Sequence, residues 1–235
     1  MRSLLFFALF AMGWAAWGQE GTPEERLFEA IDEGKELVAE GVLASSKVNL
    51  GARNVQGETP LHRAVEKGMK ELSRALAKAG ANLRSRSNSG ETVLHIAALH
   101  ADPAMTEFLL GAGADPKARN DDGESPLHWA ALSGNVSVAA LLLGKGADPN
   151  LADIKGNRPL HAAADSGSLE LVRLLLPRSL DPKAMNREGL SAADVANERS
   201  RPDVAALLSN AVPQVSPGAS NYGTIEVDKQ PKQRF

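Results

Sequence analysis

The sequence predicts an all-α solenoid, a stack of about six helix-turn-helix units joined by hairpin-like loops. The first observation is a set of glycines spaced 33 residues apart: Gly57, Gly90, Gly123, Gly156 and Gly189. The second is a set of histidines with the same spacing: His62, His95, His128 and His161. The third is that each unit continues through alanine-rich sequence into a leucine-rich run. A fixed period of this size indicates structural units that stack on their neighbours.

The residues after each periodic glycine predict the first helix of a unit. The central units begin GETPLH (57–62), GETVLH (90–95), GESPLH (123–128) and GNRPLH (156–161). Thr59 and Ser125 are suited to cap a helix, and the proline that follows needs no N–H partner at the first helical position. Leu61 and Ala64 are spaced to lie on one face of that helix.

The second helix of a unit is predicted by the leucine-rich runs, such as Leu141-Leu142-Leu143. Three of these runs end at a Gly-Ala pair, which begins at Gly80, Gly113 and Gly146. Glycine ends a helix readily because it adopts the left-handed conformation without steric cost. We therefore expect the polar stretch between each pair and the next periodic glycine to form a loop.

The pattern T-P-L-H-x-A with a period of 33 residues resembles the ankyrin repeat, and the resemblance extends over roughly residues 24–210. The units are expected near residues 24–53, 54–86, 87–119, 120–152, 153–185 and 186–210. The first and last depart from the pattern, as end caps should. Within the array, Asp102-Pro103 predicts a new helix start, and Leu176-Pro177 predicts the least regular junction.

The two ends of the chain are expected to lie outside the array. Residues 1–18 read as a cleavable signal peptide, with one positive charge, an apolar run of about 14 residues and small residues before Gln19. An uncleaved N-terminal anchor is the alternative. Residues 19–23 form a short segment, and residues 211–235 are polar enough to predict a disordered tail. We expect export to a bacterial periplasm, which suits a chain without cysteine.

Composition bounds the possible partners. Without residues 1–18 the chain holds 25 basic and 29 acidic residues, because Arg2 is the one charge removed. This mild negative balance carries no electrostatic signature of nucleic-acid binding. No later apolar segment is long enough to span a membrane, so we expect no membrane contact after signal cleavage. A monomer is expected.

Neither a metal, nor a cofactor, nor an enzyme is expected. Equivalent histidines of adjacent units should lie about 10 Å apart, whereas two zinc ligands must each lie about 2.1 Å from the metal. The resemblance implies instead that each histidine bonds to neighbouring backbone and joins one loop to the next. Asp148, Asn150 and Asp153 fall short of a calcium loop, because Ala152 occupies a ligand position. Phosphate loops, serine elbows and nucleophilic cysteines are absent from the sequence.

The resemblance implies a concave binding face formed by the hairpin tips and the exposed ends of the first helices. By position, the tips are Val55, Gln56 and Glu58; Asn88, Ser89 and Glu91; Asp121, Asp122 and Glu124; and Ile154, Lys155 and Asn157. The helix-end positions are Glu66 and Lys67; Leu99 and His100; Leu132 and Ser133; and Asp165 and Ser166. Acidic central tips beside two leucines suit a partner with hydrophobic anchors flanked by lysine or arginine.

Trp129 follows His128 directly and is open to two interpretations. It is either a hot spot of the interface or, as we favour, a packing residue between helices, since Ile96 at the equivalent position is also apolar.

The function that the resemblance implies is protein binding. We expect the chain to capture a partner protein as a scaffold or stabiliser. The alternative is an immunity or inhibitor protein that neutralises a toxin enzyme in the periplasm. A hydrolase that uses surface carboxylates is a third and different class.

Overall fold

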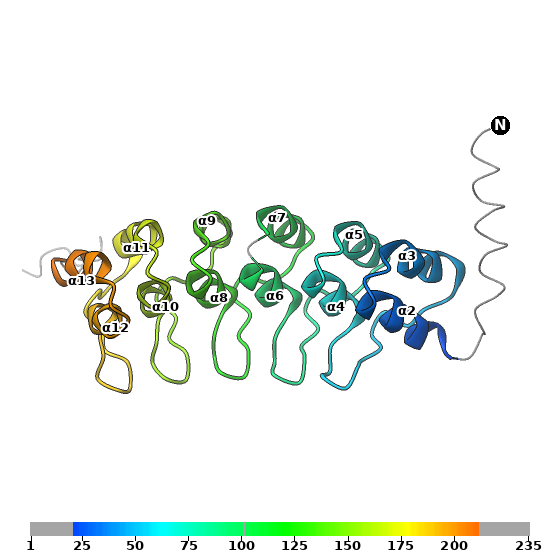
Figure 1. Ribbon diagram of the computed structural model, residues 1–235, viewed down its shortest axis with the longest axis horizontal. Helices are drawn as coiled ribbons and strands as arrows, with labels where there is room; N and C mark the ends of the chain where they lie inside the picture. The colour runs from blue at the N-terminus through cyan, green and yellow to red at the C-terminus, as the bar shows by residue number, and fades with distance from the viewer. Residues whose placement is uncertain (1–20, 101, 212–235) are drawn as a thin grey trace, which may run out of the picture.

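The protein is described by a computed structural model, which covers residues 21–100 and 102–211. The expected signal peptide (1–18), and the expected tail from residue 212 onward, lie outside the described residues. The described residues form twelve α-helices in six successive pairs. Figure 1 shows one row of first helices, a parallel row of second helices, and hairpin loops that project from the first row. The prediction of an all-α repeat solenoid is confirmed.

The first helices are α2 (Pro23–Asp32), α4 (Pro60–Glu66), α6 (Val93–Leu99), α8 (Pro126–Leu132), α10 (Pro159–Ser166) and α12 (Ala192–Glu198). The second helices are α3 (Glu36–Ser45), α5 (Lys70–Lys78), α7 (Pro103–Gly111), α9 (Val136–Gly144), α11 (Leu169–Leu175) and α13 (Pro202–Ser209). In the described part of the chain, β-pairing is limited to one isolated bridge between Met185 and Ser191.

Repeating leucines and alanines fill a core that runs through the stack. The first helices contribute Leu61, Leu94, Leu127 and Leu160, and the second helices contribute Leu76, Leu109, Leu142, Leu175 and Leu208, all buried. Small residues lie where the first helices meet: Ala64, Ala97, Ala130, Ala163 and Ala196 are at most 1 % exposed. A single unit has no second apolar surface of its own to cover these side chains, so each unit depends on its neighbours.

Two irregular places in the sequence have a local structural explanation. Asp102 is the N-cap of α7, and its carboxylate accepts hydrogen bonds from the backbone N–H groups of Ala104 (3.0 Å) and Met105 (3.2 Å). At the expected weak junction, α11 ends at Leu175 and a short 3₁₀ turn, Leu176–Arg178, follows around Pro177.

The hairpin loops of successive units are joined by backbone hydrogen bonds. The N–H of Asn88 donates to the carbonyl of Gln56 (2.9 Å), and the N–H of Asp121 donates to that of Ser89 (3.0 Å). The next two junctions repeat the contact, from Ile154 to Asp122 (2.9 Å) and from Arg187 to Lys155 (2.8 Å). The five hairpin loops therefore form a continuous edge rather than five independent tips.

The periodic glycine permits this close approach. Gly90 has a φ of +76°, and a Cβ atom placed on it would lie 2.8 Å from the backbone nitrogen of Asp121. Gly113, at the end of α7, also has a positive φ (+95°), but a Cβ atom there would meet no other atom within 4 Å. Both glycines thus have a positive φ, but only Gly90 lies in close contact with the loop of the next unit.

The variants Gly90→Ala and Gly113→Ala separate these two effects. We expect Gly113→Ala to lower the free energy of unfolding by about 1–2 kcal/mol, because alanine is strained in the left-handed region. Gly90→Ala should cost at least about 3 kcal/mol, because it also displaces the loop that bonds to Ser89. Urea denaturation of both variants measures the difference. Equal losses would show that the loop contact does not contribute to stability.

Candidate functional site

Four apolar side chains of the expected binding residues are exposed to solvent. At the loop tips, Val55 is 87 % exposed and Ile154 is 46 % exposed. At the ends of adjacent first helices, Leu99 is 42 % exposed and Leu132 is 48 % exposed. Exposed aliphatic side chains on neighbouring units are candidate anchors for a partner.

The buried histidines form a ladder between units. The N–H of Thr59 donates to Nδ1 of His62 (3.2 Å), and Nε2 of His62 lies 3.1 Å from the carbonyl oxygen of Ser85 and 3.3 Å from that of Glu91. A carbonyl oxygen can only accept, so Nε2 carries the proton and Nδ1 is the acceptor. Each later Nε2 likewise reaches a carbonyl of the next unit, from His95 to Glu124, His128 to Asn157 and His161 to Leu190.

This geometry holds the rings in the neutral form. Burial lowers the pKa of all four ladder histidines, and that of His95 falls to about 4. A second proton at Nδ1 would also point at the backbone N–H that now donates a hydrogen bond to this atom, and the two protons would repel each other. The histidines therefore support the loops, as the resemblance implied.

A second ladder, of arginines, was missed by the sequence analysis. Nη1 of Arg53 donates to the carbonyl of Arg86 (2.5 Å), and Nη2 of Arg119 donates to that of Ala152 (2.8 Å). Arg86 instead reaches the carboxylate of Asp121 (2.7 Å) in the next unit. Arg53, Arg86 and Arg119 keep the 33-residue spacing, which is the signal that could have revealed them.

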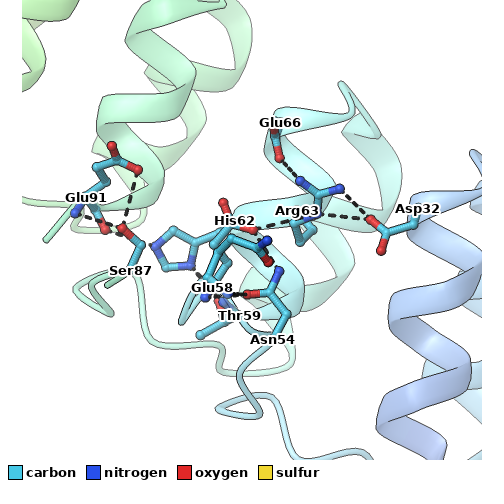
Figure 2. A network of polar contacts seen from close by, with 10 residues as sticks. Asp32, Asn54, Glu58, Thr59, His62, Arg63, Glu66, Ser87 and Glu91 are labelled. Carbon is cyan, nitrogen blue, oxygen red and sulfur yellow. Dashed lines mark hydrogen bonds and ion pairs between the residues drawn. The ribbon is translucent and has the colours of Figure 1, made fainter. Parts of the chain in front are cut away.

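Several carboxylates of the expected acidic tips are neutralised within the chain. Arg63 lies among Asp32 of the first unit, Glu58 and Glu66, and forms ion pairs with all three (Figure 2). Burial opposes the charge on Arg63, but the hydrogen bond with Asp32 and the charges of the three acids raise its pKa above the usual value. Asp165 similarly pairs with Arg199. Less free negative charge is left on this face than the sequence suggests.

Trp129 is half-buried and packs between two units. Its Nε1–H donates to Oε2 of Glu124 (2.7 Å), and its ring meets that of His95 edge-on, with 5.5 Å between centroids. These contacts support the packing interpretation. They also explain why Glu124, which further accepts a hydrogen bond from Asn120 (3.0 Å), is only partly exposed.

The other residues of the loop tips and helix ends differ in how far they are exposed. Asn88 and Asn157 join adjacent loops, through the carbonyl of Val55 (3.0 Å) and the side chain of Asn186 (2.8 Å) respectively. Side chains open to solvent belong to Gln56, Lys67, Ser89, His100, Asp122, Ser133 and Lys155. Glu91 and Ser166 are half-buried. The side chains open to solvent, together with Leu99 and Leu132, form the surface that is left available for a partner.

A pocket of about 300 Å³ opens between the second and third units. It is lined by Val65, Glu66, Lys67, Gly68, Lys70, Ala97, His100, Asp102 and Met105. Val65, Ala97 and Met105 are buried apolar residues, whereas Lys70 and Asp102 form an ion pair (2.9 Å). His100 in this lining directly follows Leu99, so the pocket lies at the end of α6, whereas α8 and Leu132 do not line it.

Within residues 21–100 and 102–211, there is no group of three or more His, Cys, Asp or Glu side chains that could hold a metal ion. Among the helices of the same residues, none has the length and apolar character needed to cross a bilayer.

Comparison with known proteins identifies one family. A family model described as ankyrin repeats (three copies) matches residues 27–120, 85–153 and 127–216 in three overlapping segments. No curated protein matches the chain.

The histidine ladder makes stability depend on pH. The pKa of His95 is about 4 in the folded chain, against about 6.5 for an unfolded histidine. Its contribution is therefore fully present above about pH 6.5 and is lost as the pH falls toward 4. From pH 7 to pH 5 we expect this residue alone to lower the free energy of unfolding by about 2 kcal/mol. The other three ladder histidines act in the same direction.

Urea denaturation at pH 7, 6 and 5 measures this loss, and the ring proton shifts of the histidines report which rings become charged. Ladder rings that already become charged between pH 7 and pH 6 would contradict a neutral ladder.

Proposed function

The chain belongs to the ankyrin-repeat family, whose repeats mediate protein–protein interaction, and from this we propose that it is a periplasmic binding module that holds one partner protein on its concave face. Its role would be that of a scaffold or stabiliser for the partner. Ankyrin repeats typically bind without catalysis, and the proposed mechanism needs neither a cofactor nor a chemical step. A preformed surface binds well because little conformational entropy is lost on association.

The observation that carries the proposal is the pair of exposed leucines at the ends of adjacent first helices, Leu99 and Leu132. The hairpin loops at the opposite ends of these helices are held by the histidine ladder and by backbone hydrogen bonds between units. Rigid apolar anchors within a polar rim are the usual anatomy of a protein interface.

The alternative role, an immunity or inhibitor protein, depends more strongly on negative charge at the tips. Pairing of Glu58 with Arg63, and of Asp121 with Arg86, reduces the charge available to attract a basic toxin enzyme. The scaffold role is therefore the one we propose. If deletion of the gene for this protein abolishes the activity of one resident protein without stopping growth, the scaffold role is supported. If deletion inhibits growth and the neighbouring gene encodes a secreted enzyme, the alternative is favoured.

A photo-crosslinking amino acid at Leu132 tests the concave face. We expect it to trap one protein in the native cell, because Leu132 lies on the proposed contact surface. The matched control carries the same amino acid at Ala140, an exposed position on the second helix α9. The same captured protein from both positions, or capture from Ala140 alone, would contradict a concave site.

Export is tested separately by the N-terminus of the mature chain. Cleavage after the small residues of the expected signal peptide should yield a chain that begins at Gln19 in the periplasmic fraction. N-terminal sequencing measures this directly. An intact chain recovered with the cytoplasm would reject the proposed location while leaving the binding face untouched.

A further inference from the structure

The pocket between the second and third units has a basic side chain on each side. The C-cap residue, which directly follows the first helix, is Lys67 in the second unit and His100 in the third. The two positions are 33 residues apart, both side chains are exposed, and both line the pocket. They are therefore equivalent residues of adjacent units that meet at one opening.

The equivalent residues of the next two units are serines, and they are bonded to the array. The hydroxyl of Ser133 donates to the carbonyl of Ala130 in its own helix (3.1 Å) and to that of Ala98 in the preceding unit (3.3 Å). Ser166 donates to the carbonyl of Ala163 (2.9 Å). A small side chain at this position is thus held by backbone, whereas the two basic ones extend into solvent.

The other charged groups of the pocket are paired within the chain. Lys70 forms an ion pair with Asp102 (2.9 Å), and Asp102 is also the N-cap of α7. Glu66 pairs with Arg63 (Figure 2). Both carboxylates of the lining therefore have a cation of their own.

Lys67 and His100 have no such partner. In the part of the chain that the structure describes, neither side chain has a hydrogen bond or an ion pair. The helix dipole favours a basic residue at the C-terminal end of a helix, but it supplies no counter-ion. An anion that enters the pocket would meet both basic groups without displacing an internal partner.

Apolar surface adjoins these basic groups. Leu99, which is 42 % exposed, directly precedes His100, and the buried Val65 and Met105 lie at the floor of the pocket. The residue equivalent to Leu99 in the second unit is the acidic Glu66. The volume of about 300 Å³ is enough for an acidic side chain with its methylene groups.

We propose that the pocket receives the side-chain carboxylate of an aspartate or glutamate of the partner, between Lys67 and His100, while a neighbouring apolar side chain of the partner packs on Leu99. The bound segment is thus one in which an acidic residue adjoins a large apolar one. This inference rests on the proposed protein-binding function and specifies the chemistry of its partner. Charge complementarity of this kind determines which partners are accepted.

The inference differs from what the acidic loop tips suggest. Those tips precede the first helices, whereas the pocket lies where α4 and α6 end. A partner that spans both ends of these helices would therefore present basic residues to the loops and an acidic residue to the pocket.

A random peptide library displayed on phage and selected on the full chain tests the inference. The peptides are fused to the coat protein through their C-termini, so that every carboxylate of the random segment belongs to a side chain. We expect the enriched peptides to share an aspartate or glutamate beside a large apolar residue. The best of them is then synthesised with an amidated C-terminus and measured by fluorescence anisotropy.

Two variants of the pocket should weaken this binding. We expect Lys67→Gln to lower the affinity about fivefold, and the double variant Lys67→Gln, His100→Ser to lower it at least about tenfold and to reduce the effect of added salt. Serine is the residue that the fourth unit has at the position of His100. Both variants should fold as well as the parent, since neither side chain has a partner in the described residues.

The matched control is Lys145→Gln, which also removes one exposed positive charge. Lys145 is the C-cap of the second helix α9 and does not line the pocket. We expect this variant to change the peptide affinity less than twofold. Reversal completes the test: Lys67→Glu should bind a peptide in which lysine replaces the acidic residue more tightly than it binds the original peptide.

The outcomes separate the two proposals. Peptides without an acidic residue in common, peptides that bind the double variant as tightly as the parent, or a selection that enriches no peptide all overturn this inference. The proposed function still stands in those cases if a protein is captured at Leu132. Peptide binding that is unaffected by Leu99→Ser, Leu132→Ser and the pocket variants alike, together with no capture at Leu132, overturns both.

Discussion

The hydrogen bond from a buried, neutral histidine to a backbone carbonyl of the next unit is the interaction on which the rest of the structure depends. In each of the four central units, Nδ1 accepts from the backbone just before the first helix, and Nε2 reaches the following loop. One side chain therefore orients its own helix and anchors its neighbour. Since a single helix pair cannot bury its apolar face, these four links help to join the second to sixth units into one array.

The residues that stabilise the repeat array differ from those that could recognise a partner. Positions that repeat are used for folding: leucines and alanines in the core, glycines where loops approach, and arginines that tie loop to loop. We expect a partner to be recognised through positions where the repeat is broken. Glu91, for example, has Ser87 and the apolar Ile96 at the two places where Glu58 and Glu124 have an asparagine and a second N–H donor.

Prediction from sequence succeeded for the helix caps and for the periodic histidines, but not for the periodic arginines. The histidine ladder could be assigned to structure because its spacing excludes a shared metal, and the capping role of Asp102 followed from its place before a proline. The arginines are equally periodic, but their hydrogen-bond partners in the next loop depend on how far a long side chain reaches, which the spacing alone does not give. Trp129 could be given two interpretations, and its bond to Glu124 needed coordinates.

By itself, the sequence determined the class of fold, the period, and the residues that serve the scaffold, because helix caps, helix faces and left-handed glycines are set by neighbours a few positions away. Only the tertiary structure decided which charges remain free. Arg63 collects Asp32 from 31 residues earlier, and Arg86 reaches Asp121, 35 residues later. Such pairings depend on how the units stack in space. An acidic residue at a loop tip therefore remains free to bind a partner only where no lysine or arginine of a neighbouring unit pairs with it.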